Sequence, residues 1–247
     1  MMEETGRLDG RLAYARLPGL GPGVVFLPGF RSDMQGSKAL ALRDHCAAQG
    51  RALLRFDYSG HGESAGRFED GTIGAWAADA VDAFDALTSG PQVLVGSSMG
   101  GWIALLLARA RPERVAGLIG IAPAPDFTQA LMWPAFSEAQ RQTIMQAGIL
   151  HLPSEYGEPT PVTRALIEDG KRHAMLDAPI PLTCPVRILQ GMQDPDVPWR
   201  HALRLVEALQ GNDVRLHLVK GGDHRLSRPE DLRLLEETLE SLLLAQL

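Results

Sequence analysis

The sequence predicts a single α/β domain, with a mostly parallel central sheet flanked by helices and a helical cap inserted into it. Three observations lead to this prediction. Short apolar runs bounded by glycine or proline alternate with longer segments of helical periodicity. The alternation stops over residues 123–181, where two amphipathic helical patterns replace it. It then resumes, so we expect the cap to lie within one domain that spans residues 1–247.

In the first half of the chain, strand patterns alternate regularly with helix patterns. The run from Val24 to Leu27 is apolar and ends at a Pro-Gly pair, which is typical of a buried strand. The helix predicted after it, over 39–49, is closed by a glycine. The helix predicted over 73–87 carries its large apolar side chains near one face and its aspartates elsewhere. The remaining elements predicted in this half are strands over 51–56, 92–95 and 118–122 and a helix over 99–110.

The segment 123–181 contains helical patterns over about 137–147 and 161–176, joined by proline-rich connections. We expect no strand in it. It keeps many apolar side chains, which favours a packed cap over a linker. Beyond it, strands are predicted over 186–190 and 214–219, and helices over 199–209 and 230–244.

Bulk properties restrict the classes of function. The net charge of −6 argues against nucleic acid and against anionic membrane surfaces as partners. Cys46 and Cys184 lie far apart, so we expect no disulfide framework. The first ten residues, MMEETGRLDG, lack the pattern of a signal or transit peptide, and no apolar run is long enough for stable membrane insertion. We therefore expect a cytoplasmic enzyme, whose oligomeric state the sequence does not specify.

A nucleophile is predicted at Ser98. Residues 96–100 read Gly-Ser-Ser-Met-Gly and match G-x-S-x-G, directly after a predicted strand and before a predicted helix. The tight turn needs glycine two positions either side of the serine, because bulkier side chains would collide there. The alternative interpretation is a glycine-rich turn with a helix-capping serine, but the strand–turn–helix context favours catalysis.

A base and an acid are predicted after the serine along the chain. His224 follows the strand predicted over 214–219 and fits best among the seven histidines. His61 precedes the nucleophile and is interpreted as a loop-shaping residue. Two aspartates compete for the acid that orients the histidine. Asp194 is favoured by its place three residues after Gly191, and Asp196 remains the alternative.

An oxyanion hole needs two backbone N–H donors, which we assign to Phe30 and Met99. Trp102 and Trp133 are candidate substrate-binding residues of an acyl pocket, although packing of the cap against the core is the favoured interpretation of either one taken singly. Arg31 either meets a polar leaving group or is solvated.

Five segments resemble the α/β-hydrolase superfamily: LPGF at 27–30, RFDYSGHGES at 55–64, GSSMGGW at 96–102, GMQDPDVPW at 191–199 and GGDHRLS at 221–227. Together with LPSEY at 152–156, they are similar to the abhydrolase-domain branch of palmitoyl-protein thioesterases and acyl-glucuronide esterases. The resemblance implies the α/β-hydrolase fold, a cleft between sheet and cap, and no metal or organic cofactor. Pro28 and Gln190 depart from the family, because many relatives have histidine at these positions.

The predicted function is that of a serine hydrolase, a carboxylesterase or acyl thioesterase. It would hydrolyse small or fatty-acyl esters and thioesters through an acyl-enzyme on Ser98, with a small molecule or an acylated protein as substrate. Two alternatives remain open at this point. The same triad could cleave carbon–carbon or peptide bonds, or the chain could be a non-catalytic ligand-binding member of the fold.

Overall fold

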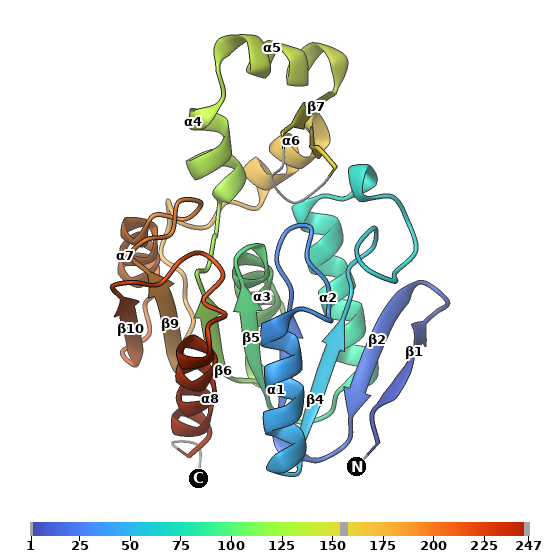
Figure 1. The fold of residues 1–247 in the computed structure, drawn as a ribbon, viewed down its shortest axis with the longest axis vertical. Helices are drawn as coiled ribbons and strands as arrows, with labels where there is room; N and C mark the ends of the chain where they lie inside the picture. Colours follow the sequence, from blue (N-terminus) through green and yellow to red (C-terminus); the bar gives the residue numbers. More distant parts are fainter. Residues whose placement is uncertain (1, 154–157, 245–247) are drawn as a thin grey trace.

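The computed structural model describes residues 2–153 and 158–244. Its main sheet has eight strands in the order β1-β2-β4-β3-β5-β6-β9-β10 (Figure 1). The neighbours from β4 through β10 are parallel, and only the β1–β2 and β2–β4 pairs are antiparallel. The strands are β1 (Glu4–Leu8), β2 (Leu12–Leu17), β3 (Leu20–Leu27), β4 (Arg51–Phe56), β5 (Gln92–Ser97), β6 (Val115–Ile121), β9 (Val186–Gly191) and β10 (Val214–Val219). The mostly parallel sheet is thereby confirmed.

Helices cover both faces of this sheet (Figure 1). α1 (Ser37–Ala48) and α8 (Pro229–Leu244) pack on one face, where they enclose one apolar cluster with the strands. α2 (Ile73–Leu87), α3 (Met99–Ala110) and α7 (Trp199–Ala208) enclose a larger cluster on the other face. Two short 3-10 turns, η1 (Phe68–Asp70) and η2 (Pro112–Arg114), lie in the connections. Because the strands are parallel, the loops at their carboxyl ends gather at one edge.

Every strand and helix predicted outside the segment 123–181 is present, with its bounds shifted by a few residues at most. The N-terminal pair β1–β2 was not predicted. β1 is largely exposed and carries few apolar residues, so its periodicity is weak. It forms because β2 pairs with β4 and thereby extends the sheet beyond its parallel part.

The segment 123–181 rises above the carboxyl edge of the sheet (Figure 1). The expectation of no strand there is wrong, because β7 (Ile149–Leu152) and β8 (Thr160–Thr163) form an antiparallel pair. The helix expected over 161–176 is correspondingly shorter, since Thr163 ends β8 and caps the next helix by accepting the Leu166 N–H at 3.1 Å. The helical elements of the segment are η3 (Thr128–Met132), α4 (Trp133–Ala135), α5 (Glu138–Ala147) and α6 (Arg164–Arg172).

The cap, as we call residues 123–181, has a small apolar cluster of its own. Phe136, Ile144, Val162 and Ile167 are buried in it. The LPSEY motif falls only partly within the cap that the structure describes, since residues 154–157 lie outside the described residues. Among the helices of residues 2–153 and 158–244, none is long and apolar enough to span a membrane.

Candidate active site

Ser98 occupies the sharp turn between β5 and α3, with φ 55° and ψ −119°. Such a positive φ is strained for a residue with a side chain. Steric collisions explain why glycine is needed at the two positions that flank the serine. A Cβ at Gly96 would collide with the Gly100 carbonyl, and a Cβ at Gly100 would collide with the Leu27 carbonyl. The turn therefore presents the serine at the N-terminus of α3, above the carboxyl edge of the sheet, as the motif predicts.

Three side chains remote in sequence form a continuous hydrogen-bonded chain at this edge. The Ser98 Oγ lies 3.1 Å from His224 Nε2, and His224 Nδ1 lies 2.8 Å from Asp194 Oδ2. The three residues follow β5, β10 and β9. The structure thus brings Ser98, His224 and Asp194 together in the arrangement that a serine nucleophile, a base and an orienting acid require.

The Asp194 side chain is fully buried and fully hydrogen-bonded. Its Oδ1 accepts the backbone N–H groups of Asp196 at 2.9 Å and Val197 at 2.8 Å. Its Oδ2 accepts the Gln190 side-chain amide at 3.1 Å in addition to His224. These donors stabilise a buried carboxylate without a full counter-ion. The sequence did not reveal that Gln190 supports this carboxylate. The one sequence feature that set Gln190 apart was that many relatives have histidine at this position.

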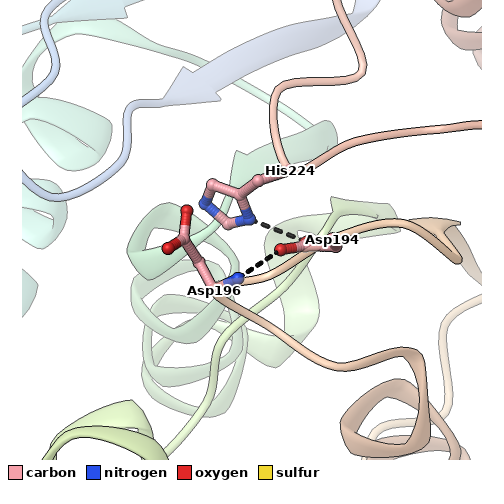
Figure 2. A group of neighbouring side chains, drawn as sticks. All are labelled: Asp194, Asp196 and His224. Carbon is pink, nitrogen blue, oxygen red and sulfur yellow. Dashed lines mark hydrogen bonds and ion pairs between the residues drawn. The ribbon is translucent and has the colours of Figure 1, made fainter. Parts of the chain in front are cut away.

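Asp196, the alternative acid, lies beside the imidazole but takes another role. Figure 2 shows that the hydrogen bond from His224 Nδ1 goes to Asp194, while Asp196 contacts Asp194 through its backbone amide. The Asp196 side chain is exposed and lines the same cavity as Ser98. The geometry therefore favours Asp194 as the acid.

Asp194, Asp196 and His224 also offer ligand atoms within 4.8 Å of one another, as a metal site would require. Four N–H donors already occupy the Asp194 oxygens, and the second imidazole nitrogen of His224 contacts Ser98. This donor set fits orientation of the histidine better than coordination of a metal ion.

The two predicted oxyanion donors flank the nucleophile. Met99 is the first residue of α3, where backbone N–H groups have no acceptor within the helix. Phe30 follows Gly29, which packs against the nucleophile turn so closely that an added Cβ would lie 3.4 Å from the Ser98 Cβ. Phe30, Ser98 and Met99 all line one cavity. Both predicted donor residues therefore lie at the same cavity as Ser98.

The cavity has a volume of about 920 Å³ and is lined by residues of both the sheet edge and the cap. Its two sides differ in chemistry. The cap side is apolar and is lined by Phe127, Leu131, Met132, Ala135, Phe136 and Leu152. The side formed by the start of α1 and the loop after His224 is polar, with Asp33, Lys38 and Arg225. Burial lowers the pKa of Lys38 to about 8, and its Nζ donates to the Arg225 carbonyl at 2.5 Å.

The structure does not bring the two candidate tryptophans into this cavity. Trp102 is fully buried, and its Nε1 donates to the His173 carbonyl at 3.3 Å. Trp133 packs against the cap cluster, with the Arg141 guanidinium 5.6 Å from its ring centre. Neither residue is among the described residues that line the cavity, so both take the packing role that was the alternative interpretation.

Comparisons with known proteins agree with this geometry. The protein family described as "Serine aminopeptidase, S33" matches residues 22–165. Palmitoyl-protein thioesterase ABHD10, mitochondrial, is 41% identical in Homo sapiens over 234 residues, which cover 94% of this chain and 76% of that protein. The Mus musculus protein of the same name is 43% identical over 236 residues, covering 94% of this chain and 78% of that protein.

Two solved structures are similar along nearly the whole chain. A hydrolase from Agrobacterium vitis S4 is 43% identical with a TM-score of 0.94, covering 98% of this chain and 99% of that one. Mouse alpha/beta hydrolase domain-containing protein 10 is 39% identical with a TM-score of 0.89, covering 98% of each chain. The chain therefore belongs to the serine aminopeptidase S33 family of α/β-hydrolases, and within it is similar to the ABHD10 proteins.

Proposed function

We propose that this protein is a serine hydrolase that cleaves fatty-acyl esters or thioesters through an acyl-enzyme on Ser98. The observation that carries the proposal is the hydrogen-bonded chain from Asp194 through His224 to Ser98, at the edge of a cavity that is apolar on its cap side. The relatives named palmitoyl-protein thioesterase support an acyl group on a protein as one form of the substrate.

In the proposed mechanism, the Ser98 oxygen attacks the acyl carbonyl carbon while His224 Nε2 takes the hydroxyl proton. The amides of Phe30 and Met99 stabilise the negative oxygen of the tetrahedral intermediate. The intermediate collapses as the bond to the leaving group breaks, and the imidazolium returns the proton to the departing thiolate or alkoxide. His224 then removes a proton from water, which attacks the ester carbonyl and releases the acid from Ser98.

The cavity supports an acyl chain on the cap side. Its volume of about 920 Å³ lies at the upper end of the range of ligand pockets, about 300–1,000 Å³. Leu131, Met132 and Phe136 offer the adaptable apolar surface that suits a flexible chain. The polar side, with Lys38 and Arg225, suits a leaving group that is small and polar or part of a protein surface.

Peptide hydrolysis is a second candidate, favoured by the description of the matched family as a serine aminopeptidase. Both reactions use the same triad, so they differ in the substrate that the cavity accepts. The extent of the apolar lining favours an acyl chain.

The prediction of a cytoplasmic enzyme stays a prediction, and the relatives carry the word mitochondrial in their names.

The test combines labelling with a substrate panel. A fluorophosphonate probe should label the wild-type protein and should not label Ser98→Ala, while the neighbouring Ser97→Ala serves as the matched control and keeps the label. Labelling that persists in Ser98→Ala rejects this nucleophile. The panel compares p-nitrophenyl esters of increasing chain length, acyl-CoA thioesters and aminoacyl p-nitroanilides. Faster turnover of the aminoacyl anilides than of any ester or thioester would establish the peptidase instead.

A further inference from the structure

We propose that His61 is a positioning residue for the reaction: it fixes the oxyanion loop, residues 28–31, by accepting a hydrogen bond from the Arg31 backbone amide. The inference rests on the proposed function, because it concerns the Phe30 donor of the same active site. His61 does not contact Ser98 in the hydrogen-bonded chain described above, so its effect passes through the backbone of this loop.

The oxyanion loop adopts a conformation that needs external support. Arg31 has a φ of 56°, in the left-handed region that residues with a side chain rarely occupy. Its backbone N–H donates to His61 Nε2 at 3.3 Å. Arg31 directly follows Phe30, so an anchored Arg31 amide fixes the peptide plane between them. This restricts the backbone rotations at Phe30 that would turn its own N–H away from Ser98.

His61 is itself held in place on all sides. It is 4% exposed, and its ring centre lies 5.0 Å from those of Phe68 and Trp76 and 5.6 Å from that of Tyr58. Its Nδ1 lies 3.3 Å from the Ser59 carbonyl, which is an acceptor. The two contacts together assign the proton to Nδ1 and leave the lone pair of Nε2 for Arg31. Burial lowers the pKa of His61 to about 4, so this neutral acceptor persists near pH 7.

The segment after β4, which contains His61, also holds the chain just beyond the oxyanion loop. In addition, rings around His61 contact the side chain of Phe30. Asp57 Oδ1 accepts the Met34 N–H at 2.7 Å, a few residues beyond Arg31. The Phe30 ring packs edge-on against Phe68 and Trp76, which are two of the rings around His61. Backbone and side chain of the oxyanion loop are therefore attached to one buried cluster.

The cap holds Arg31 from the opposite side. The Arg31 guanidinium donates to the Thr160 hydroxyl at 2.8 Å and to the Glu158 carbonyl at 3.0 Å, both near the start of β8. Any substitution of Arg31 would break the contact with the cap, and a change to glycine would also relieve the backbone strain. His61 is the better residue to change, because its substitution removes the buried acceptor and leaves the contact with the cap in place.

The experiment compares kcat and KM of three variants with wild type on a short p-nitrophenyl ester. His61→Phe keeps a ring of similar size but removes the acceptor, and His61→Gln supplies an amide oxygen as a replacement acceptor. Tyr58→Phe is the matched control, since it changes another ring of the cluster. The Tyr58 hydroxyl has no hydrogen-bond partner among the residues that the structure describes. A donor that acts in the transition state affects kcat more than KM.

We expect His61→Phe to lower kcat by about 10- to 100-fold, less than the about 10²- to 10³-fold loss seen when an oxyanion donor is removed outright. KM should change by less than about threefold, because the ground state is bound as before. His61→Gln should recover most of the loss, and Tyr58→Phe should match wild type. Unchanged kcat in a folded His61→Phe variant, or a rise in KM alone, overturns the inference.

A second measurement needs no variant. In ¹⁵N NMR of the wild-type protein, His61 should show a protonated Nδ1 and an unprotonated Nε2 at pH 7, and a proton on Nε2 overturns the inference whatever the variants do. Failure of the proposed function has a different signature. In that case the wild-type protein hydrolyses no ester or thioester, or Ser98→Ala retains activity, while the NMR result is unaffected.

Discussion

The carboxyl edge of the sheet and the cap are built in different ways, although both line the same cavity. At the edge, positions are fixed by close backbone approaches at Gly96 and Gly100 and by a buried carboxylate whose oxygens are all hydrogen-bonded. The cap encloses a cluster of four buried apolar residues and contributes flexible side chains such as Met132. Under the proposed function, the edge would set the chemistry and the cap would set which acyl group is accepted. Substitutions in the two regions should therefore change different quantities.

The largest effect is expected at the edge, in the pair Asp194→Asn and Asp196→Asn. Asparagine at 194 keeps the shape but loses the charge that orients and stabilises the imidazolium, so kcat should fall by about 10³- to 10⁴-fold. Asp196 is exposed and makes no side-chain hydrogen bond to His224 among the described contacts, so its substitution should change kcat by less than about fivefold. Steady-state ester hydrolysis measures both, and equal losses would contradict the assignment of the acid.

The close packing of the nucleophile turn predicts a loss of stability in Gly100→Ala. The new Cβ would collide with the carbonyls of Leu27 and Pro28, and backbone cannot move aside as a flexible side chain would. The free energy of unfolding should fall by about 3 kcal/mol. Gly36→Ala is the matched control, because its Cβ would meet only ordinary contacts at 3.7 Å or more. Urea denaturation distinguishes the two, and equal stability would show that the turn tolerates a side chain.

Acidification should lower the stability of the folded protein through His61. The pKa of His61 is lowered from 6.5 to about 4, mainly by burial, against smaller opposing effects of the Asp79 and Asp33 charges. Between these values the unfolded chain binds a proton that the folded protein does not, so stability is full above pH 6.5 and falls as the pH falls. From pH 7 to pH 5 the free energy of unfolding should drop by about 2 kcal/mol from this group.

His61→Gln isolates that contribution, because the amide does not titrate. Burial also lowers the pKa of His201, which adds a loss of the same sign to both proteins. Urea denaturation at pH 7 and pH 5 should therefore show a shallower pH dependence for the variant than for wild type. Identical slopes would mean that His61 binds a proton as readily in the folded protein as in the unfolded chain.

The smallest effect tests the role of the cap. Met132 lines the cavity, whereas Met145, in the same segment, is 42% exposed and is not among the lining residues described. Met132→Ala should lower the kcat/KM ratio of a decanoyl to an acetyl ester by about tenfold, through loss of about 1–2 kcal/mol of apolar contact. Met145→Ala should leave this ratio at the wild-type value. A decrease in both variants would point to cap stability rather than chain recognition.

Sequence reasoning succeeded where short-range physics decides the structure. The strands and helices outside the cap follow from local periodicity and from the glycines and prolines that end each run, as Pro-Gly ends the run 24–27. It failed at residues 161–163, where a helical pattern forms β8 because the strand finds a partner in β7. β1 escaped prediction for the same reason, since pairing with another strand is what forms it.

The sequence by itself predicted the serine turn, because five consecutive residues between a strand and a helix carry its pattern. The collision that excludes a side chain at Gly96 lies within that turn, whereas the one at Gly100 is with the Leu27 carbonyl of β3. The sequence also narrowed the acid to two aspartates and identified His224. It favoured Asp194, and the tertiary structure places its carboxylate against His224. Only the tertiary structure recruited Gln190 to that carboxylate and placed Trp102 and Trp133 in packing rather than in the cavity. The physical reason is range: sterics and periodicity act between neighbours in the chain, whereas hydrogen bonds such as that from the Arg31 amide to His61 join residues that only folding brings together.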